Sequence, residues 1–95
     1  MITSKQRATL RSMANTLEPI LYVGKGGVTE NVIKQADEAL EARELVKGSV
    51  QQNAGLDAKE VCAELAERTG GEAISAVGRK FVLYRESIEH KKIEL

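Results

Sequence analysis

Aromatic side chains are scarce in this sequence: Tyr22, Phe81 and Tyr84 are the whole set, and tryptophan is absent. An RNA-recognition-motif surface stacks bases on several aromatics of one sheet, so this scarcity argues against that class of protein. No apolar run is long enough to cross a bilayer, which predicts that there is no membrane partner. The single cysteine, Cys62, can neither form an internal disulfide nor build a metal site.

Signals for export and for catalysis are also missing. Residues 1–5 lack the apolar stretch of a secretory signal, and the cysteine usage fits a reducing compartment, so we expect a cytoplasmic protein. Cys62 falls in an apolar helical stripe, and His90 lies in a charged tail far from any nucleophile. We therefore expect that this protein is not an enzyme and that it binds neither a cofactor nor a metal ion. The length predicts one domain over residues 1–95, with a charged tail from about residue 86.

The net charge is zero, but the charges are unevenly distributed. The sequence has 14 basic and 14 acidic residues. Residues 1–29 and 77–95 are mainly basic, whereas the middle of the chain contains most of the acidic residues. Such asymmetry is typical of a protein that binds a polyanion, although solvated charged faces would also explain it.

Hydrophobic periodicity, caps and turn residues predict seven elements. Thr3 and Gln6 form a capping box, Asp57 caps the third helix, Gly70 ends it, and Gly78-Arg79 suits a two-residue II′ turn. The predicted helices cover residues 4 to 15 or 17, 29–42 and about 58–69; the predicted strands cover 20–23, 45–51, 72–77 and 80–85, with a loop at 53–55.

This order, α-β-α-β-α-β-β, predicts an α/β fold with a four-stranded mixed sheet. Pro19 at the entrance of the first strand fits an edge position, and the apolar middle of the last strand fits a central one. Alternation in the second strand places Lys47, Ser49 and Gln51 on one face, which we expect to be exposed to solvent. The tail is expected to be frayed, with weak helical character.

The junction Gly24-Lys25-Gly26-Gly27, followed by Thr29, carries the most information about function. Glycines let a ligand approach the backbone, and the N–H groups of the next helix attract anions. The spacing matches neither a P-loop nor a dinucleotide fingerprint. A G-x-x-G loop remains, the pattern with which KH modules clamp a nucleic-acid backbone, although any tight turn can also use glycines.

The first helix extends this positive region. Arg7 and Arg11 lie side by side at i and i+4, an arrangement that is unfavourable unless something anionic lies between them. Lys5 points elsewhere. Lys34 has acidic neighbours at helical spacing, so we expect it to form surface ion pairs instead of binding a ligand.

Two separated motifs resemble those of the CRM (chloroplast RNA splicing and ribosome maturation) domain family, in particular its single-domain bacterial YhbY-like members. They are the run from Gly24 to Ile33 and the run from Val77 to Arg85, within a resemblance that covers about residues 3–92. The resemblance implies a two-layer fold similar to the C-terminal domain of bacterial translation initiation factor three. It also implies the strand order 1-2-4-3, with strand 4 antiparallel to the others.

The resemblance further implies a monomeric RNA-binding protein whose partner is precursor RNA of the large ribosomal subunit, within a pre-ribosomal particle. The candidate contacts to the RNA backbone are Gly24, Lys25, Gly26, Gly27, Thr29, Arg7, Arg11, Arg79, Lys80 and Arg85. One alternative is a protein-docking module on a ribosomal protein or assembly factor, in which the glycines only form a turn. A small-molecule enzyme is a third possibility.

Overall fold

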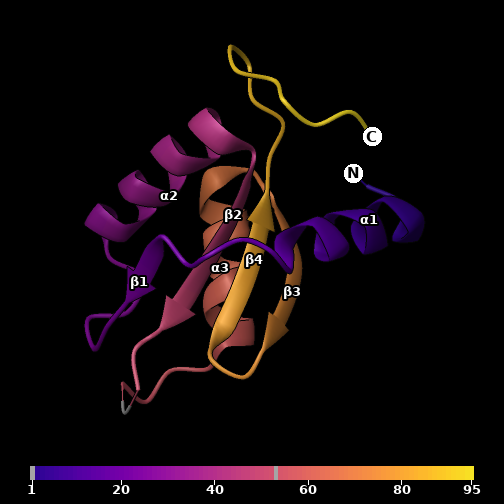
Figure 1. Cartoon of the computed structure of the whole chain (residues 1–95). Coiled ribbons are helices and arrows are strands. Elements are labelled where there is room, and N and C mark those ends of the chain that lie inside the picture. Colours follow the sequence, from indigo (N-terminus) through magenta and orange to yellow (C-terminus); the bar gives the residue numbers. More distant parts are fainter. Residues whose placement is uncertain (1, 53) are drawn as a thin grey trace.

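The computed structural model describes residues 2–52 and 54–95, and its seven elements follow the predicted order (Figure 1). The helices are α1 (Ser4–Ala14), α2 (Glu30–Arg43) and α3 (Ala58–Thr69); the strands are β1 (Leu21–Val23), β2 (Leu45–Val50), β3 (Glu72–Val77) and β4 (Lys80–Tyr84). Of the predicted loop at 53–55, Asn53 lies outside the described residues. No helix in the described ranges is both long and apolar enough to cross a membrane.

The predicted local signals set the element boundaries. Both halves of the Thr3–Gln6 capping box are formed at the start of α1. Asp57 caps α3, which ends at Gly70. Between β3 and β4, Val77 pairs with Lys80, so the connection has two residues. Gly78 has φ +60° and no positive φ is recorded for Arg79, which is the pattern of the predicted II′ turn.

The sheet has the order β1-β2-β4-β3. β1 and β2 are parallel, and β4 runs antiparallel to both of its neighbours, β2 and β3. The α/β class, the mixed four-stranded sheet, its strand order and the edge position of β1 are therefore confirmed. All the apolar side chains in the middle of β4 are buried, as expected for a central strand.

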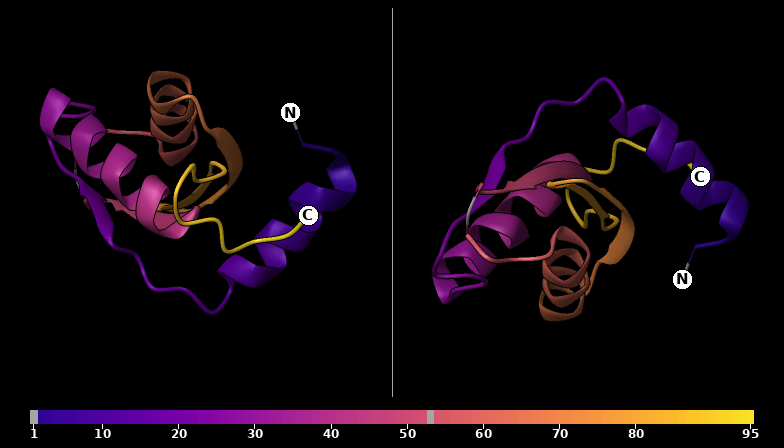
Figure 2. Two further views of the ribbon diagram at one scale, coloured as in Figure 1. Left: turned by 90° about the horizontal axis from the view of Figure 1, so that it is seen from above. Right: turned by 90° about the horizontal axis from the view of Figure 1, so that it is seen from below.

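The two faces of the sheet carry separate cores. Helices α2 and α3 cover one face, where Leu40, Leu65 and Phe81 are fully buried. Helix α1 lies on the other face, where its Leu10 packs with Val82 (Figure 2). The expectation that this second face is exposed was therefore wrong over β4 and the adjoining part of β2. Its apolar residues attract the amphipathic α1, and the face stays open only toward β1 and the β3–β4 turn.

The C-terminal tail has no regular structure, but it is held firmly, so the expectation of a frayed, weakly helical tail was wrong. Glu44 is fully buried, and its carboxylate accepts N–H bonds from Ser87, Lys92 and Ile93 at 2.6–2.7 Å. Glu41 accepts three more bonds from the tail: the Ser87 hydroxyl at 2.8 Å and two backbone N–H groups at 3.1 and 3.3 Å. We call this arrangement the tail clamp, formed by Glu41 and Glu44 with residues 87–93.

Candidate functional site

The predicted glycine loop forms a tight exposed turn between β1 and α2. The Gly27 N–H donates to the Gly24 carbonyl at 2.9 Å, so Lys25 and Gly26 occupy the centre of the turn. Both central residues are exposed. Gly27 has φ +72°, a backbone conformation that residues with a Cβ rarely adopt. The turn thus presents bare backbone and one lysine to solvent.

Helix α2 begins directly after this turn. Thr29 is its N-cap, and the Thr29 hydroxyl accepts a bond from the Val32 N–H at 3.2 Å. The other N–H groups of the first turn have no partner within the helix and carry the positive end of its dipole. Glu30 would oppose an anion here, but Arg68 of α3 pairs with it at 3.0 Å. Sequence reasoning missed Arg68, because nothing in the chain near residue 68 points to α2.

Two further candidates lie at the same end of the sheet. The Val50 N–H donates to the Arg79 carbonyl, and Ser49 pairs with Lys80. On the other side of β2, Val50 pairs with Val23, the residue before the glycine turn. Because neighbouring strands lie ~4.8 Å apart, β4 is about 10 Å from β1. Arg79 and Lys80 therefore share one end of the sheet with the glycine turn.

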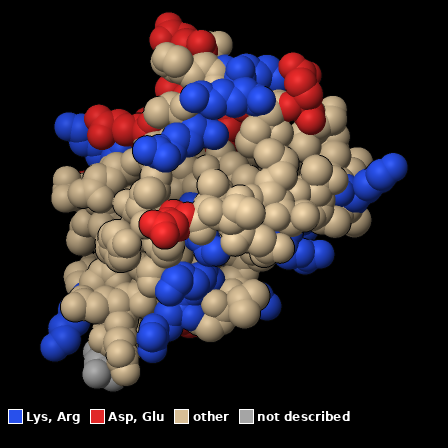
Figure 3. All heavy atoms as spheres, in the orientation of Figure 1, with Lys and Arg blue, Asp and Glu red and all other residues tan. Residues whose placement is uncertain are grey.

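Arg11 joins these cations from α1. A shallow cavity of about 350 Å³ lies between the C-terminal half of α1 and the open face of the sheet, and no acidic residue lines it. Its lining residues are Arg11, Ala14, Asn15, Lys47, Ser75, Val77, Lys80 and Val82. We call it the basic groove. Figure 3 shows mainly lysine and arginine among the charged side chains over the lower ends of β2 and β4, whereas basic and acidic side chains are mixed in the upper part of this face.

The remaining two arginines are bound within the protein. Arg7 donates to the Ala73 carbonyl and lies 4.0 Å from the Glu72 carboxylate, so the anion expected near Arg7 is internal. Arg85 follows the far end of β4, where it donates to the Thr69 carbonyl at 2.8 Å and to the Asp37 side chain. Its side chain is only 20% exposed. The structure thus separates Arg7 and Arg85 from the other candidates.

Lys34 does not form the expected surface ion pairs: within the described residues it has no ion-pair partner. Two of its acidic neighbours are engaged elsewhere, since Glu30 pairs with Arg68 and Asp37 pairs with Arg85. The local sequence pattern was therefore a poor guide, because partners from other elements compete for the same carboxylates.

The described residues bring together no catalytic set. Cys62 is 2% exposed, and burial raises the pKa of its thiol to about 11, which suits a packing role. Oxygen or nitrogen atoms of Glu41, Glu89 and His90 lie within 4.8 Å of one another. The Glu41 carboxylate, however, already accepts three bonds from the tail, which lower its pKa; the largest contribution comes from the Ser87 hydroxyl.

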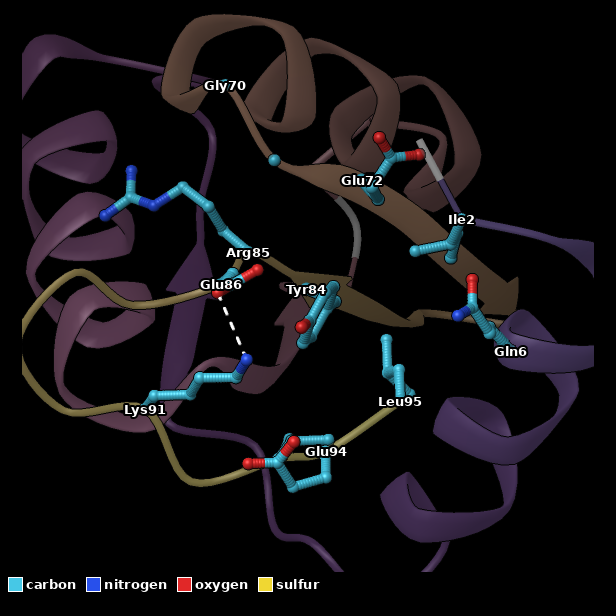
Figure 4. Close-up of a pocket in the computed structure, with 12 residues that line it drawn as sticks. Ile2, Gln6, Gly70, Glu72, Tyr84, Arg85, Glu86, Lys91, Glu94 and Leu95 are labelled. Carbon is cyan, nitrogen blue, oxygen red and sulfur yellow. Dashed lines mark ion pairs between the residues drawn. The ribbon is translucent and has the colours of Figure 1, made fainter.

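A second cavity, of about 460 Å³, lies under the C-terminal tail, between β4 and the start of α1 (Figure 4). Its charges are mixed, and the Lys91–Glu86 pair, at 3.3 Å, spans one side of it. Tyr84 lines it, with a pKa raised by burial first and by Glu44 and Glu86 second. This cavity contains no histidine, cysteine or serine, so it holds no Ser–His or Cys–His pair.

The fold and the site together define a small α/β domain with an exposed glycine turn and unopposed cations at one end of its sheet. Residues 2–85 match the family model of the CRS1 / YhbY (CRM) domain. The chain therefore belongs to the CRM domain family, as the two sequence motifs predicted.

Two curated relatives and one solved structure show what the chain is similar to. A Bacillus subtilis protein named a probable RNA-binding protein, YqeI, is 50% identical over 95 residues, which cover 100% of this chain and 99% of the relative. A Methanocaldococcus jannaschii protein named a probable RNA-binding protein, MJ0652, is 39% identical, over 96% of this chain and 69% of the relative. The solution structure of SAV1595 from Staphylococcus aureus is 49% identical, with a TM-score of 0.84 and coverage of 100% and 99% of the two chains.

Proposed function

We propose that this protein is a non-catalytic RNA-binding protein that contacts the RNA backbone through the glycine turn. The observation that carries the proposal is the exposed turn at Gly24–Gly27, placed directly before the N-terminus of α2 in a chain of the CRM family. The relatives support the proposal, since YqeI and MJ0652 are both named as RNA-binding proteins.

The turn suits a phosphate chemically. Without side chains at Gly26 and Gly27, a phosphate can approach the backbone closely. The N–H groups at the start of α2 then donate to its oxygens, Lys25 supplies a full positive charge, and the Thr29 hydroxyl can donate its own proton while it caps the helix. The Arg68–Glu30 pair offsets the negative charge of Glu30, which would otherwise repel the phosphate.

Arg11, Arg79 and Lys80 extend this surface along the RNA. None of them has an ion-pair partner within the described residues, so neutralising a phosphate would not require breaking an internal salt bridge. For Arg7 and Arg85 the RNA-contact role stays a prediction, and their internal partners make a structural role the expected one. Backbone contacts position a protein without reading bases, so binding should be largely tolerant of sequence.

We further propose that the RNA is precursor RNA of the large ribosomal subunit, bound in the cytoplasm by a monomer of this protein within an assembling particle. The resemblance to the YhbY-like CRM proteins supports this choice of partner. Crosslinking the protein to RNA in cells and mapping the crosslinked nucleotides would test it directly. If the protein still co-sediments with ribosomal particles after their exposed RNA is digested, a protein-docking function would be favoured instead.

The decisive test of the glycine turn is a double substitution, Lys25→Ala with Arg11→Ala, measured by binding to structured ribosomal RNA over a range of salt concentrations. Each lost phosphate contact should lower the slope of log affinity against log salt by roughly 0.9, so we expect the slope to fall by about two. Lys5→Ala is the matched control, because Lys5 is an exposed lysine of α1 outside this surface. An affinity that neither salt nor the double substitution changes would contradict the proposal.

A further inference from the structure

The open part of the sheet carries a row of four side chains, of which the proposed backbone contacts use only Lys80. Tyr22 of β1 pairs with Ser49 of β2, Ser49 pairs with Lys80 of β4, and Lys80 pairs with Val77 of β3. Paired residues on neighbouring strands point to the same face, so all four side chains lie on the face that α1 covers only in part. Tyr22 is 66% exposed and Val77 is 76% exposed.

These two exposed apolar side chains stand at opposite edges of the sheet, at the two ends of the row. All the large hydrophobic residues of the four described strands that are exposed, Tyr22 and Val77, lie on this one face. The opposite face has none, because α2 and α3 cover it. The open face therefore leaves apolar side chains accessible to a ligand, whereas the opposite face does not.

The basic groove adjoins this row and sets the charge of its partner. Arg11, Lys47 and Lys80 surround a floor made by Val77, Val82 and other small or apolar groups. The Lys47 ammonium donates to the Ala14 carbonyl at 3.4 Å, which leaves Arg11 and Lys80 as the cations available to a ligand. Glu18, the acidic residue between α1 and β1, lines a different cavity, which Lys47 also lines. A surface that combines an apolar floor with two available cations complements a ligand that has both flat apolar faces and negative charge, and unpaired nucleotides have both.

Tyr22 is suited to receive a base. Its hydroxyl donates to the Pro19 carbonyl at 3.0 Å, which fixes the direction of the ring along the edge strand. A ring that is already oriented loses little conformational entropy when a base stacks on it. Across the sheet, Lys80 lies two strand spacings away, about 10 Å, a distance that one or two nucleotides can span.

We propose that the open face binds an unpaired stretch of RNA, with one base stacked on Tyr22 and the neighbouring phosphates held by Lys80 and Arg11. This inference rests on the proposed function and adds the structural class of RNA, a duplex with an adjoining single strand. The glycine turn contacts backbone that can belong to a duplex. The sheet face requires unstacked bases, because a duplex keeps its base faces inside the stack.

The test compares two RNAs that share one hairpin: a blunt form, and a form extended by an unpaired run of uridines. Tyr22→Leu keeps apolar bulk at position 22 but removes the stacking plane. We expect it to weaken binding of the extended RNA about tenfold and to leave binding of the blunt hairpin unchanged. Tyr22→Phe is the matched control: it keeps the ring, loses only the bond to Pro19, and should bind the extended RNA nearly as well as the unmodified protein.

The substitution Lys25→Ala distinguishes the sheet-face inference from the proposed RNA contact at the glycine turn. This substitution should lower the affinity for both RNAs, because the glycine turn contacts the RNA in each complex. If Lys25→Ala acts as expected while Tyr22→Leu leaves both affinities unchanged, the sheet-face inference is wrong and the RNA-binding function stands. If neither substitution changes either affinity, the proposed function fails as well.

A second readout does not depend on affinity. In an NMR titration of the full chain with an oligouridylate, the amide signals of Tyr22, Ser49, Lys80 and Val77 should shift together. Shifts restricted to the glycine turn and α2 would overturn the inference, because they would leave the open face without a ligand.

Discussion

Lys80 is the first residue of strand β4, and Arg85 directly follows its last residue. Arg85 is paired within the protein, whereas Lys80 is not. Arg85 donates to the Thr69 carbonyl and to Asp37, and it also lies 4.0 Å from Glu41. Lys80 has no ion-pair partner within the described residues and lines the basic groove. The same contrast holds for the two ends of the sheet as a whole, since the tail clamp satisfies charges at one end and the glycine turn exposes them at the other.

The comparison shows how a chain of zero net charge can still present a basic surface. At the tail end of the sheet, carboxylates accept buried hydrogen bonds or form ion pairs with other residues of the protein. Fewer acidic groups then remain to neutralise the cations at the glycine end. Local pairing, and not net charge, decides where a polyanion can bind.

The largest expected effect comes from breaking the tail clamp with Glu44→Gln. The amide keeps the shape of the side chain but offers one acceptor oxygen where the carboxylate has two, so the Ser87 N–H would face an NH₂ group. We expect a loss of about 2–3 kcal/mol in the free energy of unfolding, measured by urea denaturation. The exposed Glu38→Gln on the same helix is the control and should change stability little. Equal stability of the two variants would show that the clamp contributes nothing.

Acid should open the same clamp more gradually. Burial tends to raise the pKa of Glu44, but three backbone N–H donors outweigh it, and the pKa lies below its ordinary value of 4.5. A depressed folded-state pKa means that the unfolded chain binds more protons, so this stabilisation is complete above about pH 4.5 and is lost as the pH falls further. We expect the Tm of the unmodified protein to fall over this range more steeply than that of Glu44→Gln. Parallel curves would contradict this assignment.

Substituting the residues at the two ends of β4 tests most directly whether one end serves stability and the other RNA binding. Arg85→Ala should lower stability by about 1–2 kcal/mol, because it leaves the Thr69 carbonyl and Asp37 without their donor, with little change in RNA affinity at temperatures where the variant is folded. Lys80→Ala should do the reverse: stability within about 0.5 kcal/mol and an RNA affinity lowered about fivefold. Chemical denaturation and RNA titration of the same two samples would measure both quantities. A larger affinity loss for Arg85→Ala would reverse the interpretation.

Much of the fold could be predicted because its signals are local. The Thr3 cap, the Gly78 turn and the apolar run of β4 each depend on residues a few positions apart, and the elements follow them closely. The glycine turn could be predicted for the same reason, since it lies within one short connection.

The tail clamp and the roles of the arginines could not be predicted, because they depend on residues far apart in the chain. Glu44 binds backbone N–H groups up to 49 positions away, and backbone donors leave no trace in the sequence. Arg7 and Arg11 look equivalent on a helical wheel, but α1 places Arg7 against Glu72 and Arg11 over the basic groove. Strand alternation placed Lys47 and Ser49 on the α1 face, but it could not show how much of that face α1 leaves open, and it was not applied to Tyr22.

The tail clamp also separates two boundaries that are often treated as one. The match to the CRM family ends at residue 85, whereas the residues that satisfy Glu44 lie at 87–93. A version of the chain cut at residue 85 would contain every position that the family model matches, yet it would lose all three backbone donors of Glu44 and the buried Ile93. The stretch that identifies the domain is therefore shorter than the stretch that completes its hydrogen bonds.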